Sequence, residues 1–106
     1  MRELAAFLLF FASISFAQSG FEDGNSVYEK CQSKYGSFDQ GVLLGYVMGV
    51  HDDLDGVDVC LGKSVKAGQA RDVVCKYLRD NPENRDDHGD YLVAQALTKA
   101  WPCKKP

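Results

Sequence analysis

The sequence predicts an all-α fold: a small four-helix domain stapled by two disulfides, after a cleaved N-terminal signal peptide. Apolar residues recur at helical spacing in several short segments, which residues typical of helix ends separate from one another. All four cysteines of the chain follow an apolar N-terminal run. With 106 residues, 45% hydrophobic and 25% charged, the chain has the composition of one ordinary globular domain.

Residues 1–17 are predicted to be the signal peptide. The apolar run from Leu4 to Ala17 ends with small residues at Ser15 and Ala17, as a signal-peptidase site requires. We expect cleavage after Ala17, which would leave a mature exported domain over 18–106. A short membrane anchor is the alternative, but the run is shorter than the roughly 20 residues that span a bilayer, so no stable membrane insertion is expected.

The central helix is predicted to begin at Ser37, which with Gln40 forms a capping box. Residues 41–50 are uncharged and apolar almost all round the helix, a pattern typical of a helix buried on most sides. Glycine recurs at every fourth position: Gly41, Gly45 and Gly49. Each glycine costs about 0.5–1 kcal/mol relative to alanine, so we expect a second backbone to pack closely along this stripe. That backbone could belong to the same chain or to a second copy in a homodimer.

Three further helices are predicted. One precedes the central helix: it opens at a capping box of Ser26 and Glu29 and runs to about Lys34. Two follow the central helix. The earlier of them opens at Ser64 or Ala67, and the later one spans about 86–101. The apolar stripes of the last two consist of Ala70, Val73, Val74, Tyr77 and Leu78, and of Val93, Ala96, Leu97, Ala100 and Trp101. The five tyrosines are assigned mainly to the core.

The cysteines Cys31, Cys60, Cys75 and Cys103 predict two disulfides, because an even number in a short exported domain is typical of a disulfide framework. Zinc is the alternative, but no pair has the close spacing of structural zinc sites. Three pairings are compatible with the sequence. We favour Cys31–Cys75 and Cys60–Cys103, each of which would stabilise the fold by about 4 kcal/mol through lost chain entropy.

Several classes of function are disfavoured by the sequence. The net charge of −3 and the absence of basic clusters with interleaved aromatic residues argue against nucleic acid. The chain has no nucleophile-elbow motif, no metalloprotease motif and no glycine-rich phosphate loop, and oxidised cysteines cannot act as nucleophiles. We therefore expect no enzyme activity, no cofactor and no catalytic residue.

The candidate binding site is an acidic cluster at the end of the central helix: His51, Asp52, Asp53 and Asp55, followed by Asp58. Carboxylates at a helix C-terminus oppose the helix dipole. A solvated helix end is one interpretation, and a contact surface for a basic partner is the other. A calcium site is disfavoured because the spacing does not match an EF-hand loop, so no metal is expected.

Several segments together resemble the Rap/Tai-type immunity proteins of bacterial type VI secretion systems. In order, they are 39–50 (Asp-Gln-Gly-Val-Leu-Leu-Gly-Tyr-Val-Met-Gly-Val), Cys60-Leu61, 73–78, Asn81-Pro82-Glu83, 92–97 and Ala100-Trp101-Pro102-Cys103. The chain departs from the family pattern at Leu43, where many members have a cysteine, while Cys75 lies on the third helix. The partner of Cys31 is therefore not carried over from the family.

The resemblance implies a small, exported, helical protein over 18–106 that binds and inhibits a cognate peptidoglycan amidase effector. Such a protein protects the producing cell and its siblings without chemistry of its own. On this interpretation His51, Asp52, Asp53 and Asp55 contact the amidase. The alternative is a periplasmic stress chaperone similar to the HdeA-like proteins, which would bind many unfolded clients at low pH. An immunity gene, in contrast, should lie beside a toxin gene.

Overall fold

The computed structural model describes residues 21–104, so the predicted signal peptide at 1–17 lies outside the described residues. Within them the chain forms four α-helices and one short 3₁₀ helix, as the sequence predicts for fold class. Their bounds are α1 (Gly24–Cys31), α2 (Phe38–Leu54), α3 (Ala67–Asp80), η1 (Pro82–Asn84) and α4 (Gly89–Ala100). None of the helices among residues 21–104 is long and apolar enough to cross a membrane.

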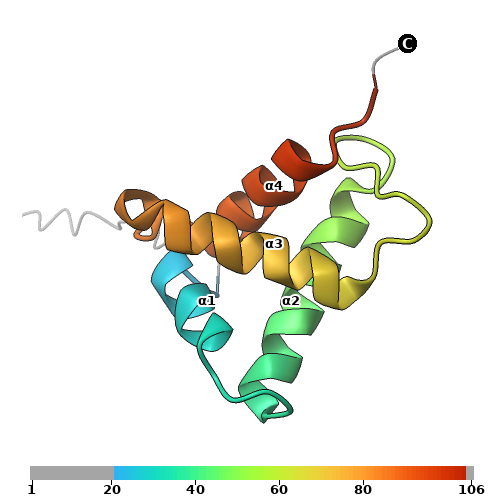
Figure 1. Ribbon diagram of the computed structural model, residues 1–106. Coiled ribbons are helices and arrows are strands. Elements are labelled where there is room, and N and C mark those ends of the chain that lie inside the picture. Colours follow the sequence, from blue (N-terminus) through green and yellow to red (C-terminus); the bar gives the residue numbers. More distant parts are fainter. Residues whose placement is uncertain (1–20, 105–106) are drawn as a thin grey trace, which may run out of the picture.

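Helix α3 lies across the other three helices and contacts each of them (Figure 1). The core between them consists of buried apolar side chains from every helix and one from the loop after α2. These are Val27, Leu43, Val47, Val59, Ala70, Val74, Leu78, Leu92, Val93, Ala96 and Leu97. The helical periodicity predicted the buried faces of α3 and α4 well, although Ala100 is exposed rather than buried.

Both disulfides that we favoured from the sequence are confirmed. Cys31–Cys75 joins the end of α1 to the middle of α3, with 5.7 Å between the Cα atoms. Cys60–Cys103 joins the loop after α2 to the segment after α4, with 4.8 Å between the Cα atoms. Each therefore ties together parts of the fold that lie more than 40 residues apart in the sequence.

The predicted start of α1 is wrong by a few residues. Asp23 is the N-cap, because its side chain accepts a hydrogen bond of 2.8 Å from the backbone N–H of Ser26. The Ser26 hydroxyl instead donates to the Glu22 carboxylate, which also pairs with Lys30 at 3.0 Å. A carboxylate accepts two hydrogen bonds readily, so these contacts fix the chain just before α1.

Helix α3 begins at Ala67, one of its two predicted starts, whereas the start of α4 differs from the prediction. Lys66 is the N-cap residue of α3 and makes no side-chain capping bond, so Ser64 is not a cap. Helix α4 begins at Gly89 rather than near Asp86, because the short helix η1 and a turn occupy the preceding residues. Backbone hydrogen bonds to neighbouring segments replace side-chain caps here; the N–H of Gly89, for example, donates to the carbonyl of Glu22 at 2.8 Å.

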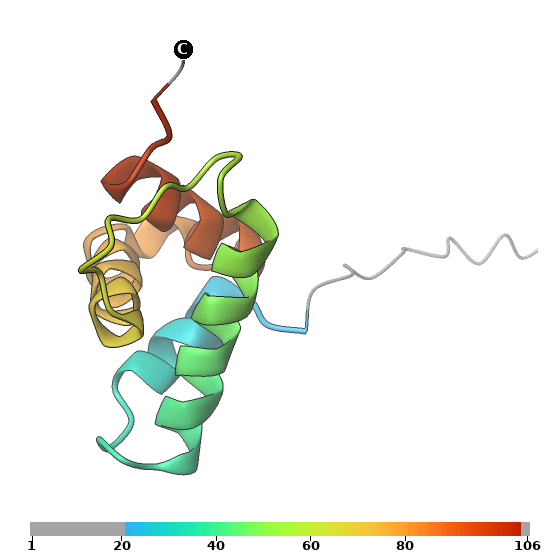
Figure 2. The same ribbon diagram turned by 90° about the vertical axis from the view of Figure 1, so that its right-hand side faces the viewer.

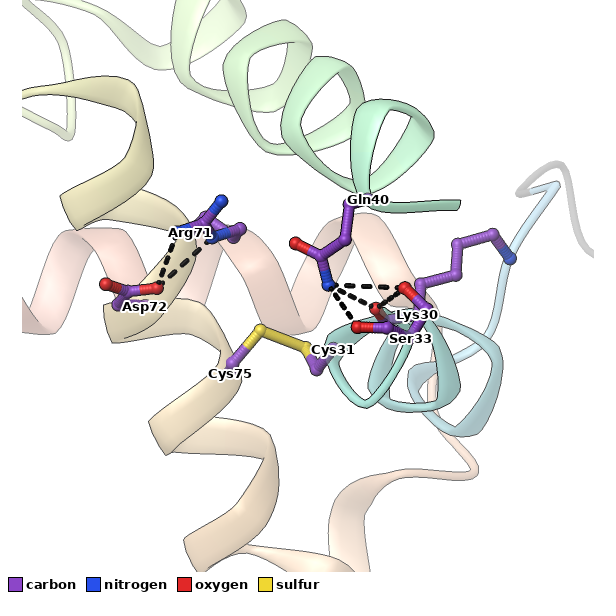
Figure 3. Close-up of polar contacts among 7 residues, drawn as sticks. All are labelled: Lys30, Cys31, Ser33, Gln40, Arg71, Asp72 and Cys75. Atoms are coloured by element: carbon purple, nitrogen blue, oxygen red, sulfur yellow. Dashed lines mark hydrogen bonds and ion pairs between the residues drawn. A yellow bond between two sulfur atoms is a disulfide. The ribbon is translucent and has the colours of Figure 1, made fainter. Parts of the chain in front are cut away.

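Ser37 is confirmed as the N-cap of α2, but the capping box is incomplete. The Ser37 hydroxyl accepts a hydrogen bond of 3.3 Å from the N–H of Gln40. The Gln40 side chain turns away from Ser37 and donates to the carbonyls of Lys30 and Ser33, at 2.9 and 3.2 Å (Figure 3). It thereby holds the end of α1 beside the Cys31–Cys75 disulfide, an arrangement that the local sequence pattern does not predict.

The environment of α2 contradicts the sequence prediction. Only Leu43 and Val47 of this helix are buried, while Phe38 is 85% exposed and Met48 44% exposed. No backbone packs along the glycine stripe, because a Cβ placed at Gly41, Gly45 or Gly49 would meet nothing within 4 Å. Among residues 21–104, α2 thus carries an apolar outer face that no other helix covers.

Candidate functional site: the acidic end of α2 and its loop

The predicted acidic cluster lies on the last turn of α2, with His51 between two of its carboxylates. The His51 Nδ1 atom is 3.0 Å from an oxygen of Asp52, and its Nε2 atom is 3.7 Å from an oxygen of Asp55. The His51 side chain is only 18% exposed, whereas those of Asp52 and Asp55 are 77% and 64% exposed. The imidazole makes one hydrogen-bond contact, with Asp52, while among residues 21–104 its buried Nε2 atom has no hydrogen-bond partner. Both carboxylates remain open to solvent.

The loop after α2 is held in a tight turn. The carbonyl of Leu54 accepts hydrogen bonds of 3.0 to 3.2 Å from the N–H groups of Val57, Asp58 and Val59. Gly56 has φ of 78°, a left-handed conformation that glycine adopts without strain. Val59 is fully buried, while Val57 is 73% exposed at the tip. Val59 therefore anchors the turn to the core, and Val57 is exposed to solvent.

The same loop is fastened to the C-terminal segment (Figure 2). The N–H of Cys60 donates to the carbonyl of Trp101 at 2.9 Å, and Val59 forms a β-bridge with Pro102. The Cys60–Cys103 disulfide closes this contact covalently. A surface built from α2 and this loop is consequently rigid before any partner arrives, which lowers the entropy cost of binding.

A groove lies between α2 and α4, beside the acidic cluster. It has a volume of about 600 Å³ and is lined by Gly45, Tyr46, Gly49, Val50, Asp53, Leu54, Asp90, Tyr91 and Ala94. Most of its lining is apolar, with the carboxylates of Asp53 and Asp90 as the charged groups. Burial, together with the negative charges of Asp90 and Glu22, raises the pKa of Tyr46 to about 12.

The four predicted site residues therefore divide into two groups. Asp52 and Asp55 each lie next to His51. Asp53 instead lines the groove and takes part in none of the ion pairs found within residues 21–104. The cluster that looks continuous in the sequence thus contributes to two adjoining features of the surface.

Asp90 and Tyr91 also belong to this surface, although the sequence pattern did not predict them as site residues. The assignment of the tyrosines to the core is wrong for Tyr91, which is 51% exposed, and for Tyr35, which is 84% exposed. The helical register could have predicted the exposure of Tyr91, because this residue does not fall on the buried stripe formed by Val93, Ala96 and Leu97. Its position opposite Gly45 and Gly49 depends on the packing of α2 against α4.

Neither a free thiol nor a cluster of metal ligands is found among residues 21–104. All four cysteines of the chain are in disulfides, so no thiol is available as a nucleophile. Over residues 21–104, no three His, Cys, Asp or Glu side chains converge in a way that could hold a metal ion. The end of α2 presents exposed carboxylates beside a mostly apolar groove.

The fold and this surface define a disulfide-stapled helical domain suited to binding a protein. The family model for Rap1a immunity proteins matches residues 23–103, which is nearly all of the described structure. The chain belongs to the Rap1a immunity protein family. The family resemblance seen in the sequence is thereby confirmed, and membership indicates a role in immunity to a type VI effector. The search of curated proteins returned no match to the chain.

Proposed function

We propose that this chain is a periplasmic immunity protein that binds and inhibits a cognate peptidoglycan amidase delivered by a type VI secretion system. It would protect the producing cell and its siblings without catalysing a reaction. The family match over residues 23–103 is the observation that carries this proposal. The rigid surface at the end of α2 gives it a physical basis.

Two features support a periplasmic location. The disulfides Cys31–Cys75 and Cys60–Cys103 require an oxidising compartment to form and persist. The apolar run up to Ala17 has the length and the ending of a signal peptide. An inhibitor in the periplasm would meet the amidase where its peptidoglycan substrate lies.

The proposed contact surface consists of Asp52, Asp53 and Asp55, supported by His51. Three carboxylates on one rigid helix end would attract basic groups at the rim of an amidase cleft and speed association. The exposed Val57 at the loop tip would add apolar contact beside them. Such a complex would block entry of peptidoglycan by occlusion.

Reversing the charge of the surface tests this site. Asp52→Lys combined with Asp53→Lys is expected to weaken binding of the amidase by about 10- to 100-fold, because attraction becomes repulsion. Isothermal titration of the amidase into each purified protein measures the change. Unchanged affinity would remove this surface from the proposal.

A matched control has the same net charge as the Asp52→Lys, Asp53→Lys variant. The control combines Glu83→Lys with Asp86→Lys. Both residues follow the C-terminal end of α3, and that end lies far from the acidic cluster (Figure 1). These two side chains are exposed and belong to none of the ion pairs of residues 21–104. We expect the control to bind within about twofold of the wild type.

The biological role has its own test. A strain that lacks this gene should be killed by wild-type siblings that deliver the amidase, and expression of the gene from a plasmid should restore survival. Equal survival of the deletion strain and the wild type under attack would contradict the proposed role in immunity.

A further inference from the structure

Gly45 and Gly49 keep open a groove that the fold itself does not require. A Cβ at either position would meet nothing within 4 Å, and neither glycine has a positive φ. Alanine would therefore fit both positions and would strengthen the helix. Both glycines line the groove, so its depth at these two positions depends on the missing side chains.

The groove also carries a negative potential. Asp53 lines it from α2 and Asp90 from α4, and no cationic side chain is among its lining residues. The raised pKa of Tyr46 agrees with this geometry, because burial and then the charge of Asp90 oppose ionisation of the phenol. Tyr91 is half exposed at the same groove and offers an aromatic ring.

We propose that this groove receives one arginine or lysine side chain of the amidase, an inference that rests on the proposed function. The aliphatic stem lies over Gly45 and Gly49, and the cationic head contacts Asp53 and Asp90. Tyr91 adds a cation–π contact. A purely aliphatic side chain fits less well, because it would leave two carboxylates desolvated and unpaired.

The test fills the groove without harming the fold. The Gly45→Ala, Gly49→Ala double variant is expected to raise the Kd for the amidase by about 10-fold or more, because two methyl groups occupy the floor. The same variant should melt about 3 °C or more above the wild type. Titration of the purified full chains with the purified cognate amidase gives the Kd, and thermal denaturation of the same chains gives the melting temperature.

Gly41→Ala is the matched control. Gly41 belongs to the same stripe and is equally open, but it does not line the groove. This variant should also melt at a higher temperature, while its Kd stays within about twofold of the wild type. Loss of affinity in the double variant alone then cannot be attributed to a stiffer helix.

Asp90→Asn tests the charge separately, since Asp90 lies outside the acidic cluster on α2. Asparagine can still accept the hydrogen bond of 2.9 Å from the N–H of Tyr91, so α4 should begin as before. We expect the Kd to rise about 5- to 10-fold and to depend less steeply on salt concentration.

Three outcomes would overturn the inference. If the double variant binds the amidase as the wild type does, the groove is not used, although the proposed function stands. If the wild type is a dimer, the double variant is a monomer and the two bind the amidase with the same Kd, the occupant of the groove is a second copy of this chain. If the wild type does not bind the amidase at all, the inference and the proposed function both fail.

Discussion

Loss of the Cys60–Cys103 disulfide is expected to lower the free energy of unfolding by about 4 kcal/mol, because it closes a loop of more than 40 residues. Small exported domains have marginal cores, so a loss of this size can leave the chain unfolded at 37 °C. Replacing both cysteines with serine and titrating with urea measures the effect. A variant within about 1 kcal/mol of the wild type would contradict this account of the staple.

The Cys31–Cys75 pair provides the comparison. Its sequence separation of 44 is almost the same as the 43 of the other pair, so chain entropy predicts nearly equal losses of stability. The local consequences should differ. Loss of Cys60–Cys103 should increase hydrogen exchange at the amides of Val59 and Cys60 more than loss of Cys31–Cys75 does, because these amides lie in the loop that it fastens.

Gly24→Ala is expected to destabilise the fold by about 3 kcal/mol, although alanine is the better helix former. A Cβ at Gly24 would lie 2.4 Å from Cδ1 of Leu92 and 2.6 Å from the carbonyl oxygen of Arg85. The second contact is with backbone, so the start of α1 would have to move away from the turn before α4. Chemical denaturation of the variant measures the loss.

The same substitution on α2 should have the opposite sign. Gly41→Ala meets nothing within 4 Å and should raise the free energy of unfolding by about 0.5–1 kcal/mol. A stabilising Gly24→Ala, or a Gly41→Ala that costs as much as Gly24→Ala, would contradict the close packing at Gly24 and the open space at Gly41.

The contrast between Gly24 and Gly41 shows which features of the fold can be predicted from the sequence. Helix existence and the buried faces of α3 and α4 follow from local periodicity, and both predicted disulfides are present in the structure. Close backbone approach was predicted at the glycines of α2, where none occurs, and it is found instead at Gly24 and Gly89. The spacing of glycines in the sequence shows where close packing of helix backbones is possible, but the tertiary fold determines which of these positions form such contacts.

The candidate site shows the same limit. Asp52, Asp53 and Asp55 could be singled out because carboxylates at a helix C-terminus are unusual. The groove could not be predicted, because Gly45 and Tyr91 come together only when α2 packs against α4. The apolar wheel of α2 was interpreted as burial, whereas its outer face stays exposed at Phe38 and Met48.

The central claim is that this chain inhibits a peptidoglycan amidase by binding it. The most direct test adds increasing amounts of the purified chain to the amidase and follows release of soluble fragments from purified peptidoglycan. The account predicts that release stops near an equimolar ratio and that the chain alone releases nothing. Full amidase activity in the presence of a large excess of correctly folded chain would contradict it.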